Sequence, residues 1–338
     1  MSFQSALEKA WYGKQFWVWI LAPLMLIFAF LTAIRRQLYR FNILSSSKPP
    51  IPVIIVGNIS VGGNGKTPVV IALAEYLNSK GHKVGVLSRG YKGSVEQFPH
   101  FVSEDDSTAT IGDEPFLIYN RVACNLVIDP VRRRGANALY NKGCTVIVCD
   151  DGLQHYALGR DIELVVMDSR RIGNGFLLPM GPLRETSVRL KSVAMLIKNG
   201  NFEFQSNGTQ QVCMRLVPVE FVNVAKPSLT YKCQEFVDQN KVVTAICGIG
   251  NPRRFYDTIS TLGLEVNREK SFPDHHHYTV SDLPENRLVM TEKDAVKCKP
   301  FAHQNCWYLK ITAELPEQFY DMIDKQLVDF NNPQKREI

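Results

Sequence analysis

Three absences in the 338-residue sequence narrow the classes of protein to which it can belong. None of the eight cysteines forms a Cys-x-x-Cys pair, so we expect no zinc site. Cys144, Cys149 and Cys247 lie in apolar runs, which is typical of reduced cysteines in the core of a cytosolic protein. The net charge of +6 comes without a dense basic stripe, which favours an anionic ligand or a membrane surface over nucleic acid. The chain also lacks the Asn-Lys-x-Asp sequence that would recognise guanine, which argues against a GTPase.

The most informative segment runs from Ile54 to Thr67, IIVGNISVGGNGKT, where an apolar run stops at a glycine-rich turn ending in Gly-Lys-Thr. Backbone N–H groups of such a loop surround phosphates, the lysine reaches the β and γ oxygens, and the threonine hydroxyl holds Mg²⁺. Ser60 replaces the glycine that usually opens the loop, and a helix is expected near Val69–Ser79. The alternative is a glycine-rich turn with an incidental lysine. The predicted nucleotide-binding residues are Ser60, Val61, Gly62, Gly63, Asn64, Gly65, Lys66 and Thr67.

The amino-terminal part predicts an association with a membrane. Phe16 to Ile34 is 19 residues long without a charge, and as a helix it would extend for about 29 Å, close to the thickness of a bilayer core. Tryptophans crowd its start and arginines follow its end, a bias that would keep the body of the chain in the cytosol. A signal peptide, a buried core helix and a helix that dips into the bilayer without crossing it are the alternatives; Pro23 would suit the last. We therefore expect a membrane-associated segment over residues 1–44, either spanning or dipping.

The rest of the chain alternates Val- and Ile-rich runs with helical stretches, which predicts an α/β fold with a mostly parallel sheet. We expect a P-loop lobe over residues 45–200 and a smaller α/β lobe over residues 201–338. Ligands of such sheets gather at the carboxyl ends of the strands. The run CTVIVC ends there in Asp150 and Asp151, which with Thr67 are the predicted metal ligands. Alone, the paired acids could equally cap a turn.

Several further groups are candidates for contact with a second substrate. Asp113 lies in GDEP, which also reads as the start of a helix with proline in its first turn. Asp274 precedes three histidines, His275, His276 and His277, and one histidine oriented by a carboxylate is a good general base. A metal cage or a merely solvated histidine run are the alternatives. A second strand, glycine turn and helix, KVVTAICGIGNPRRFYDTI, lacks Gly-Lys-Ser/Thr and is interpreted as scaffold.

Taken together, these motifs resemble a known family. Behind an apolar amino-terminal helix, seven motifs follow one another in this order: GGNGKTP, LSRGYKG, GDEP, DDGLQH, GPLRE, FPDHHHY and MTEKDAVK. This set closely resembles the tetraacyldisaccharide 4′-kinases, the lipid A 4′-kinases of Gram-negative bacteria. The resemblance extends to about Lys297. It implies a P-loop lobe and a smaller carboxyl-terminal lobe with the active site in the cleft between them. In that family the GDEP aspartate pairs with a histidine of the second lobe, here Asp113 with His275, or else with His276.

The resemblance also implies a reaction and a location. ATP with Mg²⁺ would donate its γ-phosphate to the 4′-hydroxyl of a tetraacylated disaccharide 1-phosphate, at the cytoplasmic face of the inner membrane. Neither nucleic acid nor an obligate protein partner is implied. On charge alone, Arg89, Arg132 and Arg184 are candidates to bind the lipid's phosphate. The main alternative is a membrane-associated P-loop GTPase or switch protein, followed by a metallochaperone-type NTPase and a non-enzymatic adaptor.

Overall fold

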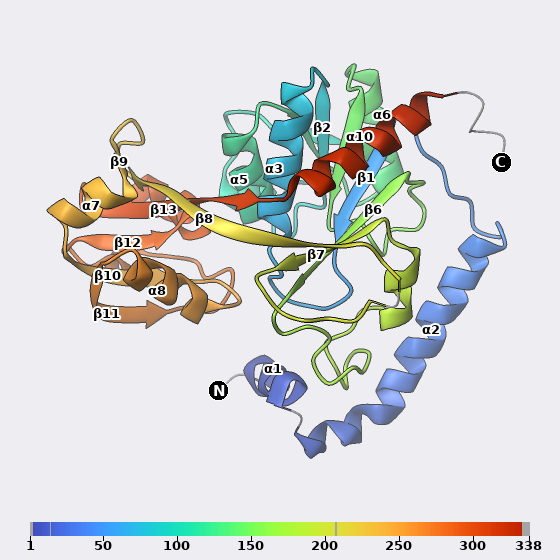
Figure 1. Cartoon of the computed structure of the whole chain (residues 1–338), viewed down its shortest axis with the longest axis horizontal. Helices are drawn as coiled ribbons and strands as arrows, with labels where there is room; N and C mark the ends of the chain where they lie inside the picture. Colours follow the sequence, from blue (N-terminus) through green and yellow to red (C-terminus); the bar gives the residue numbers. More distant parts are fainter. Residues whose placement is uncertain (1–2, 14, 207, 333–338) are drawn as a thin grey trace.

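The computed structural model describes residues 3–13, 15–206 and 208–332. Its first lobe is built on a parallel sheet with the order β7-β6-β1-β5-β2-β4 and a short antiparallel strand β3 at the edge (Figure 1). The strands are β1 (Val53–Gly57), β2 (Val84–Ser88), β3 (His100–Phe101), β4 (Asn125–Ile128), β5 (Val146–Asp150), β6 (Ile162–Asp168) and β7 (Met195–Asn199). The apolar runs β1, β2 and β5 are buried along their whole length, as expected of strands covered on both faces.

Helices cover both faces of this sheet. One face packs against α3 (Lys66–Ser79), α5 (Asp113–Arg121) and α10 (Glu317–Asn331). The other face packs against α6 (Arg132–Asn141) and part of α2 (Ala22–Arg40). The alternation of strands and helices in the sequence therefore yields the predicted three-layered α/β lobe.

The second lobe is a smaller α/β unit. Strands β11, β10, β12 and β13 are parallel neighbours in that order. Its elements are β9 (Thr230–Lys232), α7 (Cys233–Gln239), β10 (Val242–Cys247), α8 (Pro252–Thr261), β11 (Glu265–Ser271), β12 (Leu288–Thr291), α9 (Glu292–Cys298) and β13 (Cys306–Glu314). Further short helices connect strands of the two lobes: α4 (Thr108–Ile111) and η2 (Ser187–Ser192) in the first, and η3 (Val280–Asp282) and η4 (Lys299–Phe301) in the second. The predicted fold class, a P-loop lobe with a smaller carboxyl-terminal α/β lobe, is confirmed.

Two long strands connect the lobes. The first part of β8 (Gln211–Asn223) pairs with β7 in the first lobe, and its second part pairs with β13 and β9 in the second lobe. The chain then leaves β13 and returns to the first lobe as α10, where Phe319, Ile323 and Leu327 are buried against the sheet (Figure 1). The division of the chain at residue 200 stays a prediction. The last helix, which follows the second lobe in the chain, packs with the first lobe.

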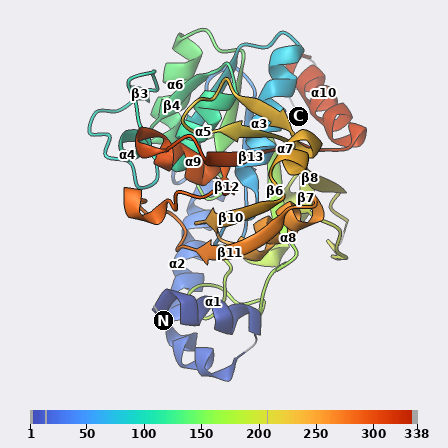
Figure 2. The same ribbon diagram turned by 90° about the vertical axis from the view of Figure 1, so that its left-hand side faces the viewer.

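The amino-terminal segment lies outside both lobes (Figures 1 and 2). The helix expected over Phe16–Ile34 appears as the 3₁₀ helix η1 (Phe16–Leu21) followed by α2, and a further helix, α1 (Phe3–Gly13), precedes it. Pro23 lies in the first turn of α2, where its missing N–H is tolerated. Residues 16–40 are long and apolar enough to cross a membrane, and few of them are buried. Side chains such as Phe16 and Ile20 are 85% and 79% exposed, a large apolar surface for a protein in water.

Candidate active site

The phosphate loop connects β1 to α3 and is held by a buried asparagine. Asn64 is 2% exposed. Its side-chain Nδ2 donates to Ser60 Oγ at 3.0 Å, and its backbone carbonyl accepts a hydrogen bond from Asn199 Nδ2 at 3.0 Å. Gly65 has φ +90°, and a Cβ atom there would come within 2.3 Å of Asn199. Glycine is therefore required at this turn, and α3 begins directly after it with Lys66 and Thr67.

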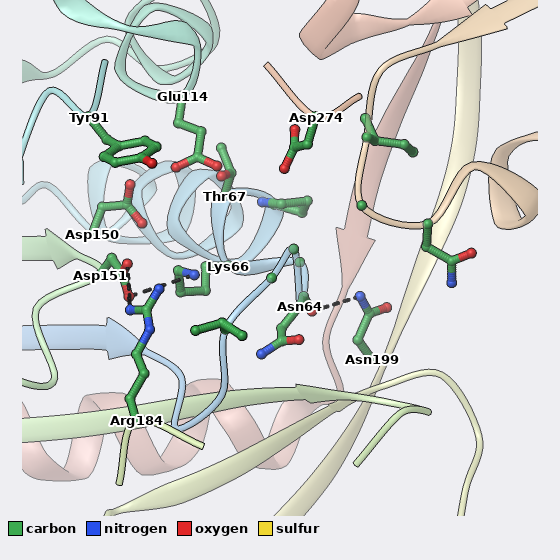
Figure 3. A pocket seen from close by; sticks show the side chains of 18 of the residues that line it. Asn64, Lys66, Thr67, Tyr91, Glu114, Asp150, Asp151, Arg184, Asn199 and Asp274 are labelled. Atoms are coloured by element: carbon green, nitrogen blue, oxygen red, sulfur yellow. Dashed lines mark hydrogen bonds and ion pairs between the residues drawn. The ribbon is translucent and has the colours of Figure 1, made fainter. Parts of the chain in front are cut away.

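The loop opens into a cavity of about 1790 Å³ that is lined by both lobes and by the amino-terminal segment. All of the predicted phosphate-loop residues except Ser60, which is buried beneath the loop, line this cavity. Figure 3 shows Lys66, Thr67, Asp150 and Asp151 on one side of it and Asp274 of the second lobe on the other.

The pKa values of the two acids at the end of β5 are shifted in opposite directions. Burial, together with the nearby Glu114 carboxylate, raises the pKa of Asp150 to about 7. Burial also acts to raise the pKa of Asp151, but the cations Lys66 and Arg184 outweigh it and hold that pKa at about 2. Lys66 Nζ lies 3.6 Å and Arg184 Nη1 3.0 Å from the Asp151 carboxylate (Figure 3).

The Asp150 carboxyl has the properties of a metal ligand. Its Oδ1 atom is buried and has no hydrogen-bond partner among the residues that the structure describes. A bound cation would satisfy this oxygen and offset the cost of burying its charge. Together with the Thr67 hydroxyl at the start of α3, the residues present therefore fit a hard cation with oxygen ligands, such as Mg²⁺.

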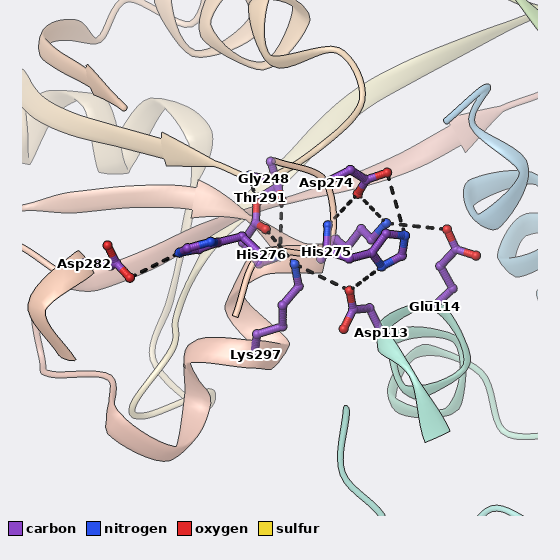
Figure 4. Close-up of polar contacts among 11 residues, drawn as sticks. Asp113, Glu114, Gly248, Asp274, His275, His276, Asp282, Thr291 and Lys297 are labelled. Atoms are coloured by element: carbon purple, nitrogen blue, oxygen red, sulfur yellow. Dashed lines mark hydrogen bonds and ion pairs between the residues drawn. The ribbon is translucent and has the colours of Figure 1, made fainter. Parts of the chain in front are cut away.

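An aspartate and a histidine from opposite lobes meet at the cavity. His275 Nδ1 lies 3.0 Å from Asp113 Oδ2, and His275 lines the cavity (Figure 4). Although burial acts to raise the pKa of Asp113, the hydrogen bond from His275 and the charges of Lys297 and Lys293 lower it below its ordinary value. An ionised Asp113 must accept, so His275 donates its Nδ1–H.

The neighbouring histidine points elsewhere. His276 Nε2 lies 3.2 Å from Asp282, and its ring stacks on Phe272 with centroids 4.3 Å apart. The structure thus brings His275, rather than His276, to Asp113. Among the described residues no group of three His, Cys, Asp or Glu side chains is placed to hold a metal ion, so the histidine run forms no metal cage.

Two lysines of the MTEKDAVK segment strengthen the contact between the lobes. Lys297 Nζ lies 3.5 Å from Asp113 and 3.2 Å from Asp294. Lys293 Nζ lies 3.0 Å from Asp274 and 3.6 Å from Glu114 (Figure 4). The sequence placed this segment at a strand end, but a single sequence gives no signal that α9 would pack against α5.

The predicted arginines occupy three different settings. Arg132 is 3% exposed; its Nη2 donates to the Asp150 carbonyl at 2.8 Å, while Nε and Nη1 are buried without a partner among the described residues. Arg184 is paired with Asp151, and Arg89 is exposed at the cavity. Burial and the charges of Arg132 and Arg89 lower the pKa of His155 to about 4. This part of the cavity therefore has a strongly positive potential that suits an anionic ligand.

Sequence reasoning missed several residues that line the cavity. Gln154 and His155 of DDGLQH and Glu185 of GPLRE lie beside the arginines, and Gln154 Nε2 donates to Glu185 at 2.9 Å. These motifs were part of the resemblance, but only their charged neighbours suggested a role. The second glycine turn, interpreted as scaffold, also lines the cavity: a Cβ atom on Gly250 would lie 3.4 Å from the amide nitrogen of Gly63.

These features define a P-loop phosphotransferase site that is closed by an additional domain. They are the strand with the loop ending in Gly-Lys-Thr, the acids on the adjacent strand, and the second lobe that faces the loop. A family model described as tetraacyldisaccharide-1-P 4′-kinase matches residues 17–328. The chain therefore belongs to this family.

Relatives cover nearly the whole chain. The tetraacyldisaccharide 4′-kinase of Tolumonas auensis is 43% identical in an alignment of 332 residues. The alignment covers 96% of this chain and 98% of the relative. That of Haemophilus influenzae is 45% identical over 337 residues, 95% and 99% of the two chains. A crystal structure of LpxK from Aquifex aeolicus in complex with ATP is similar with a TM-score of 0.79 and 29% identity, covering 92% of this chain and 99% of the other.

Proposed function

We propose that this chain transfers the γ-phosphate of ATP to the 4′-hydroxyl of tetraacyldisaccharide 1-phosphate. The observation that carries the proposal is the 3.0 Å contact of Asp113 with His275, from opposite lobes, at the cavity that the phosphate loop lines. The acceptor and the reaction are those in the printed names of relatives that align with nearly the full chain.

The phosphate loop is the proposed site for ATP. Backbone N–H groups from Gly63 to Gly65 and the Lys66 ammonium would hold the phosphates, and the Aquifex relative binds ATP. On phosphate binding, Lys66 would exchange its contact with Asp151 for the β and γ oxygens. Thr67 and Asp150 would hold Mg²⁺, with Asp151 nearby, and the ion would neutralise charge on the triphosphate.

Asp113 is the proposed proton acceptor. His275 and Lys297 both contact its Oδ2 atom, which leaves Oδ1 for the sugar hydroxyl. The hydroxyl oxygen forms a bond to the γ-phosphorus as the bond to the β,γ-bridging oxygen breaks, and its proton passes to Asp113 while ADP leaves. Because the transition state of phosphoryl transfer is loose, the proton moves late, and the base should contribute about 10²- to 10⁴-fold.

The positive part of the cavity is the proposed site for the phosphate of the lipid. Arg132 presents two buried nitrogen atoms without partners, and Arg89 and Arg184 lie at the same cavity. The apolar helix α2 borders the cavity through Phe28 and Ala29, so acyl chains of the acceptor can remain in the bilayer. This arrangement supports membrane association, and we propose that the catalytic lobes face the cytoplasm.

The experiment is transfer of labelled γ-phosphate from ATP to tetraacyldisaccharide 1-phosphate in detergent micelles, with and without Mg²⁺. We expect an Mg²⁺-dependent product with a second phosphate, which excess GTP does not suppress. The matched Asp113→Ala variant should form this product about 10²- to 10⁴-fold more slowly. ATP binding or hydrolysis without phosphorylated lipid would contradict the proposal and favour the switch-protein alternative.

A further inference from the structure

The phosphate loop has a side-chain support that its own motif does not supply. Arg170, which follows β6, donates from Nη2 to Asn64 Oδ1 at 3.1 Å and to the Gly63 carbonyl at 3.3 Å. Its guanidinium also lies over Gly62, where a Cβ atom would come within 3.1 Å of Nη1. One arginine thus contacts three consecutive residues of the loop that would bind the triphosphate.

The orientation of Arg170 is fixed from the first lobe on one side. Its Nε donates to Asp168 Oδ2 at 2.8 Å, and its backbone N–H donates to Asp168 Oδ1 at 3.0 Å. Asp168 is 6% exposed at the carboxyl end of β6, next to β1. Nη2 also lies 2.7 Å from Asp168 Oδ2, so the carboxylate holds the guanidinium through two of its nitrogen atoms.

The other side of Arg170 is covered by the amino-terminal helix α1. The ring of Tyr12 lies 5.3 Å from the guanidinium, within range of a cation–π contact, and Glu8, one turn earlier, contributes a negative charge that acts to raise the pKa of Arg170. Next to it, Trp11 Nε1 donates to the Pro179 carbonyl at 2.9 Å. Ala10, Trp11, Val18 and Met180 form a buried cluster against which Val61 of the phosphate loop packs.

The same segment carries the exposed apolar surface of the amino terminus. Phe16 and Ile20 of η1 are 85% and 79% exposed, only a few residues beyond Tyr12. Moreover, α1 precedes the residues matched by the family model, which start at 17.

We propose that Arg170 is a positioning residue for the phosphate loop and that docking of α1, through Tyr12, sets the affinity for ATP. This inference rests on the proposed nucleotide site. Without the Tyr12 ring, Arg170 is open to water on one side, and the Asn64 side chain and the Gly63 carbonyl lose a fixed donor. The loop must then be ordered by the nucleotide itself, which weakens binding.

The test measures equilibrium binding of ATP to the full chain in detergent micelles, without any lipid acceptor. We expect Tyr12→Leu, which keeps an apolar side chain but removes the ring, to raise the Kd for ATP roughly 2- to 30-fold, the range for losing a partly desolvated cation–π contact. Arg170→Lys, which loses the planar fork, should have a similar effect. Tyr12→Phe keeps the ring and should restore the affinity of the wild type.

The double variant Tyr12→Leu/Arg170→Lys should bind ATP no more weakly than Arg170→Lys alone, because both changes remove one interaction. At saturating ATP, kcat and the KM for lipid should be little changed by Tyr12→Leu. As a matched control, Phe16→Ser removes exposed apolar surface without touching Arg170, and should leave the Kd for ATP unchanged in micelles.

Three results would overturn the inference: an unchanged Kd for ATP in Tyr12→Leu, additive effects in the double variant, or a loss of thermal stability in Tyr12→Leu that Tyr12→Phe shares. Because the measurement needs no phosphoryl acceptor, failure of the disaccharide as a substrate would not affect it. A wild-type chain that does not bind ATP would count against both proposals.

Discussion

The molecule contains two units of strand, glycine turn and helix that face each other, and only one of them fits a phosphate site. In the first, residues 58–65 connect β1 to α3, two glycines have positive φ, and Lys66 begins the helix. In the second, residues 248–251 connect β10 to α8, and Arg253 and Arg254, rather than a lysine, lie in the first turn of that helix. The amide of Gly248 already donates to Asp294 Oδ2 at 3.0 Å, so a carboxylate of the chain occupies the position of an anion.

This difference shows that an amide at the second turn is taken up by a carboxylate of the chain, whereas the first turn combines a glycine-rich loop with Lys66. The second unit has its own anion built in, and this acid also binds Thr291 Oγ at 2.6 Å and Lys297 at 3.2 Å. It therefore positions α9 and, through Lys297, reaches Asp113. We infer that the first lobe provides the triphosphate site and that the second provides the groups that orient Asp113, the proposed proton acceptor.

The strongest test of the first unit is removal of its cation. Lys66→Ala should reduce phosphoryl transfer to background, on the order of 10³-fold or more, because the charge on the transferred phosphoryl group loses its main side-chain counterion. Transfer of label to the lipid measures the effect. Lys293→Ala, which removes a lysine of the second lobe, should retain measurable activity; survival of transfer in Lys66→Ala would exclude the assigned phosphate site.

The second lobe's contribution is tested at the pair between the lobes. Asp113→Ala should lower kcat by about 10²- to 10⁴-fold with little change in the KM for ATP. His275→Ala should share the direction of this effect, while His276→Ala, which leaves the contact with Asp113 intact, serves as the matched control. A rise in the KM for ATP without a fall in kcat would instead assign Asp113 a binding role.

The built-in anion of the second unit should matter for stability. Asp294 is fully buried, and Asp294→Ala leaves Lys297 without its closest partner and Gly248 without an acceptor. We expect a loss of about 3–5 kcal/mol in the free energy of unfolding, as for a broken buried ion pair. Chemical denaturation measures it, with Asp257→Ala on the exposed face of α8 as control. Equal stability of the two variants would refute the comparison.

The smallest expected effect concerns Asp150, the proposed metal ligand at the end of β5. The pKa of Asp150 is raised to about 7 by burial, above its ordinary value of 3.8, so the folded chain binds more protons than the unfolded one between these pH values. Stability should therefore fall as pH rises through this window. With EDTA present, the Tm of Asp150→Asn relative to that of the wild type should be higher by about 2–4 °C at pH 8 than at pH 5. A pH-independent difference would count against a buried carboxylate that lacks a counterion.

Much of this site followed from local sequence signals. The phosphate loop and the helix after it form one contiguous segment, and the two acids stand directly at the end of β5. Within each of these segments the spacing of the residues fixes their geometry. The pairing of Asp113 with His275 came from resemblance to a family, because the two residues are 162 positions apart and only the closure of the lobes joins them. The support of the loop by Arg170 left no signal in the sequence, since it depends on how α1 docks.

The path of the last helix has a consequence for synthesis of the chain. Phe319, Ile323 and Leu327 of α10 complete the same core as Val69 and Leu73 of α3, so the second lobe is an insertion within the first. On the ribosome, α2 emerges early and can enter the bilayer, whereas the nucleotide-binding core waits for residues near 327. The apolar helix should thus be available to a membrane before the core that carries the phosphate loop is complete.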